Sequence, residues 1–198
     1  MSAEIFLIRH GETVHNASGI AQGWSDSALS ERGQAQVRAL AERVALLRPD
    51  ALFSSPLERA MSTARPIAMA TGLPIIQLDD LREMNFGQWE GQSFRDIRAN
   101  DAEAARRWMD DPDEACPGGE SHNDVRARMA RALAATADAA KPVIVTHGTA
   151  LRLGATVLLD APIGVARHLA QDNASISIFV RRGERMVLTL WNDTSHCT

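Results

Sequence analysis

Short apolar runs alternate along the chain with longer segments whose apolar residues recur every three or four positions. This is the pattern of a chain that alternates strands with helices. The short runs predict strands at 4–9, 51–54, 74–78 and 142–146. The longer segments predict helices at 30–47, 57–71, 102–109, 121–140 and 149–159, and Pro66 is expected to kink or restart the second of these. Alternating strands and helices form a mainly parallel sheet covered on both faces, so we expect a three-layer α/β/α fold.

Three regions depart from this alternation. Residues 10–29 are polar and predict a loop. Residues 79–120 predict an irregular, lid-like insertion that contains the helical stretch 102–109. Near the end of the chain, residues 175–180 alternate in polarity, and together with residues 186–190 they predict an antiparallel pair that closes the sheet.

The composition is that of an ordinary folded protein, with 198 residues of which 45% are hydrophobic and 23% charged. This length, without repeats or low-complexity linkers, predicts a single domain over residues 1–198. The net charge of −4 argues against a nucleic-acid-binding protein, because affinity for phosphate backbones needs a cationic excess. No apolar run approaches the ~18 residues of a membrane span, the run at 5–8 is too short for a signal peptide, and the cysteines form no CxxC pair. We therefore expect a cytoplasmic protein without nucleic-acid or membrane partners, and no pattern indicates an oligomeric state.

Reactive residues follow three of the predicted strands. Arg9 and His10 end the first, Arg59 follows the second, and His147 and Gly148 follow the strand at 142–146. Ligands of open α/β sheets bind outside the carboxyl ends of the strands, so we expect these side chains to meet at one edge of the sheet. Two fixed guanidinium groups suit a phosphate dianion, because each gives charge-assisted, often bidentate hydrogen bonds. The pattern predicts a phosphate site.

The segment 7–13, which contains an Arg-His-Gly triplet, is similar to the opening signature of the histidine phosphatase superfamily, which includes the cofactor-dependent phosphoglycerate mutases. Further blocks resemble this family in the same order: 23–26, 29–33, 54–60, 81–83, 86–91, 118–121 and 145–148. The triplet alone is a weak signal, but the ordered set covers nearly the whole chain and is specific. The resemblance implies a phosphoglycerate mutase-like fold. Segments 86–89 and 117–121 resemble small bacterial members, such as α-ribazole phosphatase, glucosyl-phosphoglycerate phosphatase and broad-specificity phosphatases.

The resemblance also implies a role for each candidate residue. His10 is the implied nucleophile, which forms a phosphohistidine, and Glu83 is the implied acid, which protonates the leaving group and then activates water. The groups implied to hold the phosphoryl oxygens are Arg9, Asn16, Arg59, His147 and the Gly148 amide. Gln22 and Gly23 belong to the loop that the family places near the phosphate. The arginines supply positive charge, so the resemblance implies neither a metal ion nor a cofactor.

Chemistry adds two expectations to these roles. To attack phosphorus, His10 must be neutral at one ring nitrogen, so the other should donate to a fixed acceptor such as a backbone carbonyl. Asp80 and Glu90 lie close to Glu83 in sequence and are alternative acids. The aromatic residues near these loops are candidates for either the substrate side of the pocket or the core: Trp24, Phe86 and Trp89.

Three functions fit these residues: a metal-independent phosphomonoester hydrolase, a cofactor-dependent phosphoglycerate mutase, and a non-catalytic phospho-ligand binder. The binder is disfavoured because it needs neither a nucleophile nor an acid. Mutases of the family typically continue after the Glu83 block with Arg-His-Tyr-Gly, whereas here residues 84–87 read Met-Asn-Phe-Gly and lack the basic groups that bind a carboxylate. Against this, Arg106 and Arg107 in the insertion are able to meet an anionic substrate. The sequence favours a phosphatase that acts on a small phosphorylated metabolite.

Overall fold

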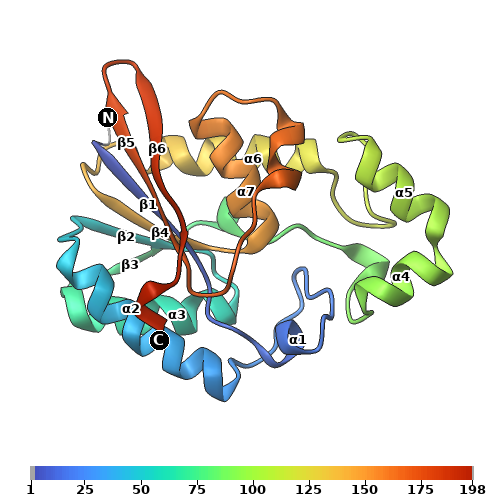
Figure 1. Cartoon of the computed structure of the whole chain (residues 1–198), viewed down its shortest axis with the longest axis horizontal. Helices are drawn as coiled ribbons and strands as arrows, with labels where there is room; N and C mark the ends of the chain where they lie inside the picture. Colours follow the sequence, from blue (N-terminus) through green and yellow to red (C-terminus); the bar gives the residue numbers. More distant parts are fainter. Residues whose placement is uncertain (1–2, 198) are drawn as a thin grey trace.

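A six-stranded sheet runs through the centre of the computed structural model, which describes residues 3–197 (Figure 1). Its strands are β1 (Glu4–Arg9), β2 (Ala51–Ser54), β3 (Ile75–Gln77), β4 (Pro142–Thr146), β5 (Ile176–Arg182) and β6 (Arg185–Asp193), in the order β3-β2-β4-β1-β5-β6. The first four in this order are parallel, β5 is antiparallel to β1, and β6 is antiparallel to β5. The prediction of a mainly parallel sheet closed by an antiparallel pair is confirmed.

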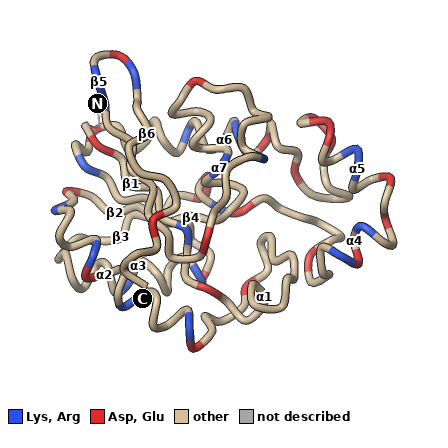
Figure 2. The backbone as a smooth tube through the Cα atoms, in the orientation of Figure 1, with Lys and Arg blue, Asp and Glu red and all other residues tan. Residues whose placement is uncertain are grey.

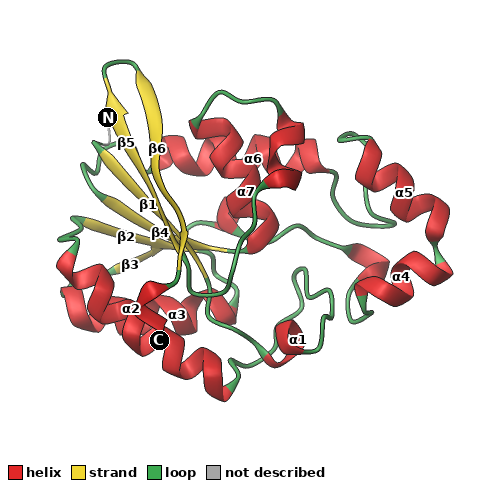
Figure 3. Ribbon diagram, viewed as in Figure 1, coloured by secondary structure: helices red, strands yellow, loops and turns green. Residues whose placement is uncertain are grey.

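Helices cover both faces of the sheet (Figure 3). α2 (Glu31–Leu46) and α3 (Glu58–Thr71) lie on one face, and α6 (His122–Ala135) and α7 (Gly148–Leu158) lie on the other. β1 explains why both faces are covered, because successive side chains of a strand point to opposite faces of the sheet. Phe6 and Ile8 pack in one buried cluster, and Ile5 and Leu7 pack in the other. The three-layer α/β/α prediction is therefore confirmed.

Two helices differ from their predicted extents. α3 runs through Pro66 without restarting, because Ala64 and Ile67 on either side of the proline stay buried against the sheet. α6 ends at Ala135 rather than near residue 140. The carbonyl oxygen of Ala140 instead accepts the N–H groups of Ala3 and Glu4 at 2.8 and 3.0 Å, so this part of the chain bonds to the start of β1.

The segment 79–120 lies beyond the ends of the strands, to one side of the sheet (Figure 1). Its elements are η1 (Asp79–Leu81), η2 (Gly87–Trp89), α4 (Phe94–Asn100) and α5 (Ala102–Asp110). α5 was predicted, whereas α4 was not, although Ser93 caps it by accepting the N–H of Asp96. The predicted loop before residue 30 likewise contains a single helical turn, α1 (Val14–Ala17). Two short elements complete the chain: η3 (Ile163–His168) and η4 (Ser195–Cys197).

Basic and acidic residues interleave over much of the backbone, including both helices of the 79–120 segment (Figure 2). Within residues 3–197, every helix is too short or too polar to cross a bilayer.

Candidate active site

The residues that follow β1, β2 and β4 line a cavity of about 470 Å³. Nearly all residues predicted for the site lie in its wall: Arg9, His10, Asn16, Gln22, Gly23, Arg59, Glu83 and Gly148. His147 is the exception, since it is fully buried behind the wall. Segments far apart in sequence thus meet at the carboxyl edge of the sheet. We call this space the phosphate cavity.

His10 is held in one orientation, with 2% of its surface exposed. Its Nδ1 lies 2.7 Å from the carbonyl oxygen of Gly11, which can only accept, so Nδ1 carries the proton. Burial, followed by the charges of Arg59 and Arg9, lowers the pKa of His10 well below its ordinary value of 6.5. The ring is therefore neutral at pH 7 and Nε2 keeps its lone pair, which is the form that a nucleophile needs.

Arg9, which is half-buried, places its guanidinium in the cavity wall. Its Nη1 donates to the carbonyl oxygen of Gln171, while its Nε is buried and has no hydrogen-bond partner among the described residues. Gly148 packs against this group, since a Cβ at position 148 would lie 3.5 Å from the Arg9 Nε. Burial lowers the pKa of Arg9 and Glu83 opposes that shift, but a guanidinium remains charged in a protein. The charge of Arg9 thus lies in the cavity wall with one N–H that no acceptor among the described residues satisfies.

Arg59 is 1% exposed and is oriented by four acceptors. Its Nη1 donates to the carbonyl oxygen of Ser25 at 2.8 Å and to the carboxylate of Asp26 at 2.9 Å. Its Nη2 donates to the carbonyl oxygen of Gly23 at 2.5 Å, and its Nε donates to Nδ1 of His147 at 3.1 Å. These bonds fix the plane of the guanidinium and leave one Nη2 proton for a ligand.

His147 supports the site from behind instead of lining it. Because its Nδ1 accepts from Arg59, its Nε2 carries the proton and donates to Oγ of Ser55 at 2.8 Å. Its ring centroid lies 5.1 Å from that of His10, and burial followed by the charge of Arg59 lowers its pKa well below 6.5. Both ring nitrogens of His147 thus have partners within the protein, Arg59 and Ser55, and a direct contact of His147 with the phosphoryl oxygens stays a prediction.

The neutrality of His10 makes the stability of the fold depend on pH. Its pKa is lowered in the folded protein, so below pH 6.5 the unfolded chain binds more protons and the free energy of unfolding decreases as pH falls. One such histidine contributes about 1.4 kcal/mol per pH unit in that range. In urea titrations between about pH 6 and 5, we expect His10→Ala to show a shallower pH slope than wild type by this amount. Equal slopes would mean that His10 is protonated in the folded protein.

The carboxylate of Glu83 is oriented by three backbone N–H groups. Oε1 accepts from Met84 at 2.8 Å and from Ala150 at 3.1 Å, and Oε2 accepts from Thr149 at 3.1 Å. Thr149 and Ala150 lie in the first turn of α7, where N–H groups have no partner within the helix. Oε2 takes a single N–H, so it retains a lone pair with which to carry a proton.

The two alternative acids are engaged elsewhere. Glu90 accepts the backbone N–H groups of Trp24 at 2.8 Å and Ser25 at 3.0 Å. Asp80 pairs with Arg131 at 2.7 Å. Within the described part of the chain, Glu83 is the acidic residue in the wall of the phosphate cavity.

An ion pair between the buried Arg128 and the half-buried Glu120 holds the backbone around Glu83. Arg128 donates to the carbonyl oxygens of Asp80, Arg82 and Glu83 at 2.9, 2.5 and 2.9 Å. Its Nε also pairs with Glu120 at 2.9 Å. Glu120 belongs to the 118–121 block, so the structure gives that block a role in supporting the Glu83 loop.

We expect Arg128→Met to lower the free energy of unfolding by about 3–5 kcal/mol, because the half-buried Glu120 carboxylate loses its cation and three backbone carbonyls lose their donor. Urea denaturation followed by circular dichroism measures this loss. Arg131→Met is the matched control on the same helix, and it should leave stability nearly unchanged because the Arg131–Asp80 pair is solvent-exposed. Similar losses in the two variants would contradict the structural role of Arg128.

The remaining predicted residues have different parts in the wall. Oδ1 of Asn16 accepts from the Thr13 N–H at 3.2 Å and from Asn173 at 3.1 Å, so its NH₂ group is the part available to a ligand. Oε1 of Gln22 is buried and unpaired among residues 3–197. Gly23 has φ +55° and its Cβ would lie 2.0 Å from a Glu90 oxygen, so only glycine fits there. No group of three or more His, Cys, Asp or Glu side chains in the described residues is arranged to hold a metal ion.

Further residues of the wall were not predicted from the sequence. Arg152 lies on α7, where its Nε donates to the Gly148 carbonyl at 3.2 Å and its Nη2 to the Thr149 hydroxyl at 3.4 Å. A signal for it existed, because Arg152 lies four residues after Gly148 on a predicted helix and thus on the same helical face. Arg167 and residues 168–171 also line the cavity, and they come from an irregular segment without a sequence signal.

The chain matches the family model of the histidine phosphatase superfamily, branch 1, over residues 5–194. The bifunctional protein Rv2228c of Mycobacterium tuberculosis is 37% identical over 181 residues, which cover 88% of this chain and 49% of that protein, so the chain spans about half its length. A probable phosphoglycerate mutase, GpmB of Erwinia tasmaniensis, is 35% identical over 178 residues, which cover 88% of this chain and 83% of that protein. Phosphoserine phosphatase 1 of Hydrogenobacter thermophilus is 32% identical, with 98% of this chain and 93% of that protein covered.

Solved structures of phosphatases have the same fold. A mycobacterial glucosyl-3-phosphoglycerate phosphatase, solved with VO3, superposes with a TM-score of 0.88 at 33% identity, and 96% of this chain and 99% of that chain are covered. A putative α-ribazole-5′-P phosphatase from Escherichia coli also gives 0.88 at 29% identity, with 98% of each chain covered. The family match over most of the sequence and these similarities show that the chain belongs to the histidine phosphatase superfamily.

Proposed function

We propose that the chain hydrolyses small phosphomonoesters through a phosphohistidine intermediate and without a metal ion. The observation that carries this proposal is the state of His10. The ring is neutral, Nδ1 is engaged by the Gly11 carbonyl, and Nε2 remains available in a cavity that also holds the guanidinium groups of Arg9 and Arg59. These are the requirements for nucleophilic attack on a bound phosphoryl group.

In the first step, Nε2 of His10 forms a bond to phosphorus while the bond from phosphorus to the ester oxygen breaks. The Gly11 carbonyl stabilises the positive charge on the phosphorylated ring through Nδ1–H. Arg9 and Arg59 stabilise the phosphoryl oxygens, and each well-placed donor contributes about 3 kcal/mol in the transition state. Glu83 gives its proton to the departing oxygen, so an alcohol leaves.

In the second step, a water molecule attacks phosphorus and gives a proton to the Glu83 carboxylate. The bond from phosphorus to Nε2 breaks, its electron pair returns to His10, and inorganic phosphate leaves. Glu83 is protonated again, so both residues are restored. His147 acts in both steps by holding Arg59, which it contacts at 3.1 Å.

Phosphoglycerate mutase activity is the second candidate function, because a relative carries that name and because Arg152 and Arg167 place further cations in the cavity wall. The feature against it is the stretch after Glu83, where Met84 and Phe86 are buried and residues 84–87 present no basic side chain.

One assay separates the candidate functions. Chelator-treated protein is given p-nitrophenyl phosphate, α-ribazole phosphate, glucosyl-3-phosphoglycerate, phosphoserine and 3-phosphoglycerate, and both phosphate release and conversion to 2-phosphoglycerate are measured. We expect phosphate release without a metal ion, and at a higher rate than any interconversion. Interconversion without net release would establish a mutase. Turnover that returns only with added metal would contradict metal independence, and no turnover would leave a phospho-ligand binder.

A further inference from the structure

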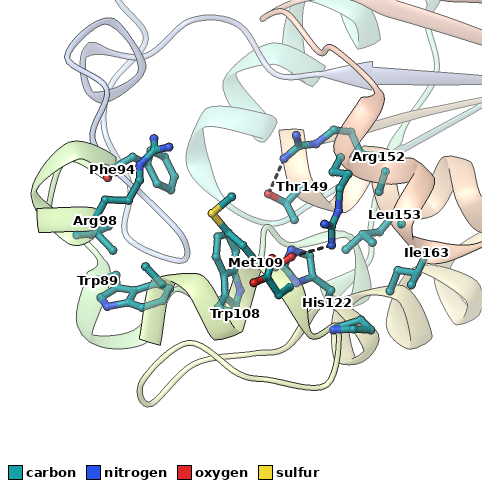
Figure 4. A pocket seen from close by; sticks show the side chains of 17 residues that line it. Trp89, Phe94, Arg98, Trp108, Met109, His122, Thr149, Arg152, Leu153 and Ile163 are labelled. Carbon is teal, nitrogen blue, oxygen red and sulfur yellow. Dashed lines mark hydrogen bonds between the residues drawn. The ribbon is translucent and has the colours of Figure 1, made fainter. Parts of the chain in front are cut away.

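A second cavity, of about 550 Å³, adjoins the phosphate cavity, and we call it the side chamber. The two spaces share part of their walls: Phe94, Thr149, Arg152 and Arg167. Figure 4 shows Phe94 and Trp108, from α4 and α5, across the chamber from Arg152 and Leu153 of α7. A molecule whose phosphoryl group lies beside His10 therefore has an adjoining space for the rest of its atoms.

The interior of the side chamber is apolar and aromatic. The residues that form it include Trp89, Ile97, Ala105, Trp108, Leu153 and Ile163. The Trp108 ring stacks on His122 with centroids 4.7 Å apart and meets Trp89 edge to face at 5.6 Å. This aromatic wall packs best against another flat, apolar surface.

The chamber wall also carries charged side chains, and two of them, Arg152 and Arg167, lie in the part that it shares with the phosphate cavity. Burial, followed by the charges of Arg152 and Arg167, lowers the pKa of His122 to about 4. The charged residues on the α4–α5 side of the wall, Arg98 and Asp110, are exposed and lie at its rim. The other residues that line the chamber are uncharged, so a charged group set among them would lose its hydration without gaining an ionic partner.

The chamber volume lies within the range of roughly 300–1,000 Å³ that ligand pockets occupy, and a phosphoryl group does not need it. We propose that the side chamber binds the leaving group of the substrate and that this group carries a flat, uncharged ring. The proposal rests on the phosphomonoesterase function above, and it names the class of ester: phosphate monoesters of alcohols that bear an aromatic or heteroaromatic ring.

The test compares kcat/KM for 2-phenylethyl phosphate and ethyl phosphate, which are both esters of primary alcohols and differ in the ring. We expect the ring ester to react at least about 10-fold faster, the discrimination that added apolar contact gives in a fitted pocket. Equal values, or faster hydrolysis of phosphoserine than of the ring ester, would overturn the proposal. Hydrolysis of p-nitrophenyl phosphate is the check on the proposed function. If the protein does not hydrolyse it, the proposed function as a whole is refuted. If the protein does hydrolyse it but the kcat/KM values of the two alkyl esters are equal, only the ring preference is refuted.

Variants of the chamber wall test whether its residues cause the preference for the ring ester. Trp108→Ala removes the face on which a ring would pack, so the ratio of the two kcat/KM values should fall toward one. Phe94→Ala tests the part of the wall that the chamber shares with the phosphate cavity, at a residue that is 37% exposed, so its truncation leaves the core intact. Met69→Ala, at an 86% exposed position on α3, is the control that should keep the wild-type ratio. A wild-type ratio in a folded Phe94→Ala or Trp108→Ala protein would contradict the assignment.

Discussion

Replacing His10 by alanine should lower kcat/KM for p-nitrophenyl phosphate by at least about 10⁴-fold, because the variant has no nucleophile with which to form the covalent intermediate. The charges around it remain in place, since Arg9 and Arg59 are held by other partners: the Gln171, Ser25 and Gly23 carbonyls and the Asp26 carboxylate. The variant should thus still bind inorganic phosphate, which isothermal titration calorimetry measures.

His15→Ala is the matched control for this experiment. His15 lies near His10 in sequence but outside the wall of the phosphate cavity, so its removal should leave turnover close to wild type. Substantial activity in a folded His10→Ala protein would mean that water attacks the ester directly or that another residue is the nucleophile. Either result would refute a covalent mechanism through His10.

Replacing Glu83 by glutamine should produce a loss that depends on the leaving group. For an alkyl phosphate, whose alkoxide needs a proton, we expect kcat/KM to fall about 10²–10⁴-fold. For p-nitrophenyl phosphate the loss should be far smaller, because nitrophenolate leaves without protonation. The readout is the ratio of the two losses, which a general weakening of the site does not change.

Glu90→Gln is the control for the acid, because Glu90 accepts backbone N–H groups of another loop and does not line the phosphate cavity. It should show no dependence on the leaving group. Thermal unfolding of both variants is measured alongside, since glutamine at position 83 turns an NH₂ group toward an N–H donor of α7. Equal losses on both esters for Glu83→Gln, or a leaving-group effect for Glu90→Gln, would move the acid role away from Glu83.

The sheet and its covering helices could be predicted because each buries an apolar face with a clear period. β1 and β4 are buried on both sides, and α2 repeats buried residues from Val37 to Val44 at helical spacing. α1 and α4 escaped prediction because they are one or two turns long and depend on local caps. The cap residues Thr13 and Ser93 do carry a signal, but it is weak without a long apolar stripe beside it.

The candidate site was likewise predictable from the sequence only in part. Arg9, His10 and Gly148 could be placed from topology, because residues that follow neighbouring parallel strands share one edge. The hydrogen bonds of His147 could not, since they depend on where Arg59 and Ser55 come to lie in three dimensions. The side chamber could be predicted only in part: Trp89 was a candidate for the substrate side, but the chamber forms only when the 79–120 segment packs beside α7 and η3.

The most direct test of the covalent mechanism is to trap the intermediate. Wild-type protein is mixed briefly with a phosphomonoester, quenched in alkali to preserve phosphohistidine, digested and mapped by mass spectrometry. We predict a phosphoryl group on Nε2 of His10 that forms and decays at rates consistent with turnover. Steady turnover with no phosphorylated peptide, or with the phosphoryl group on a different residue, would contradict it.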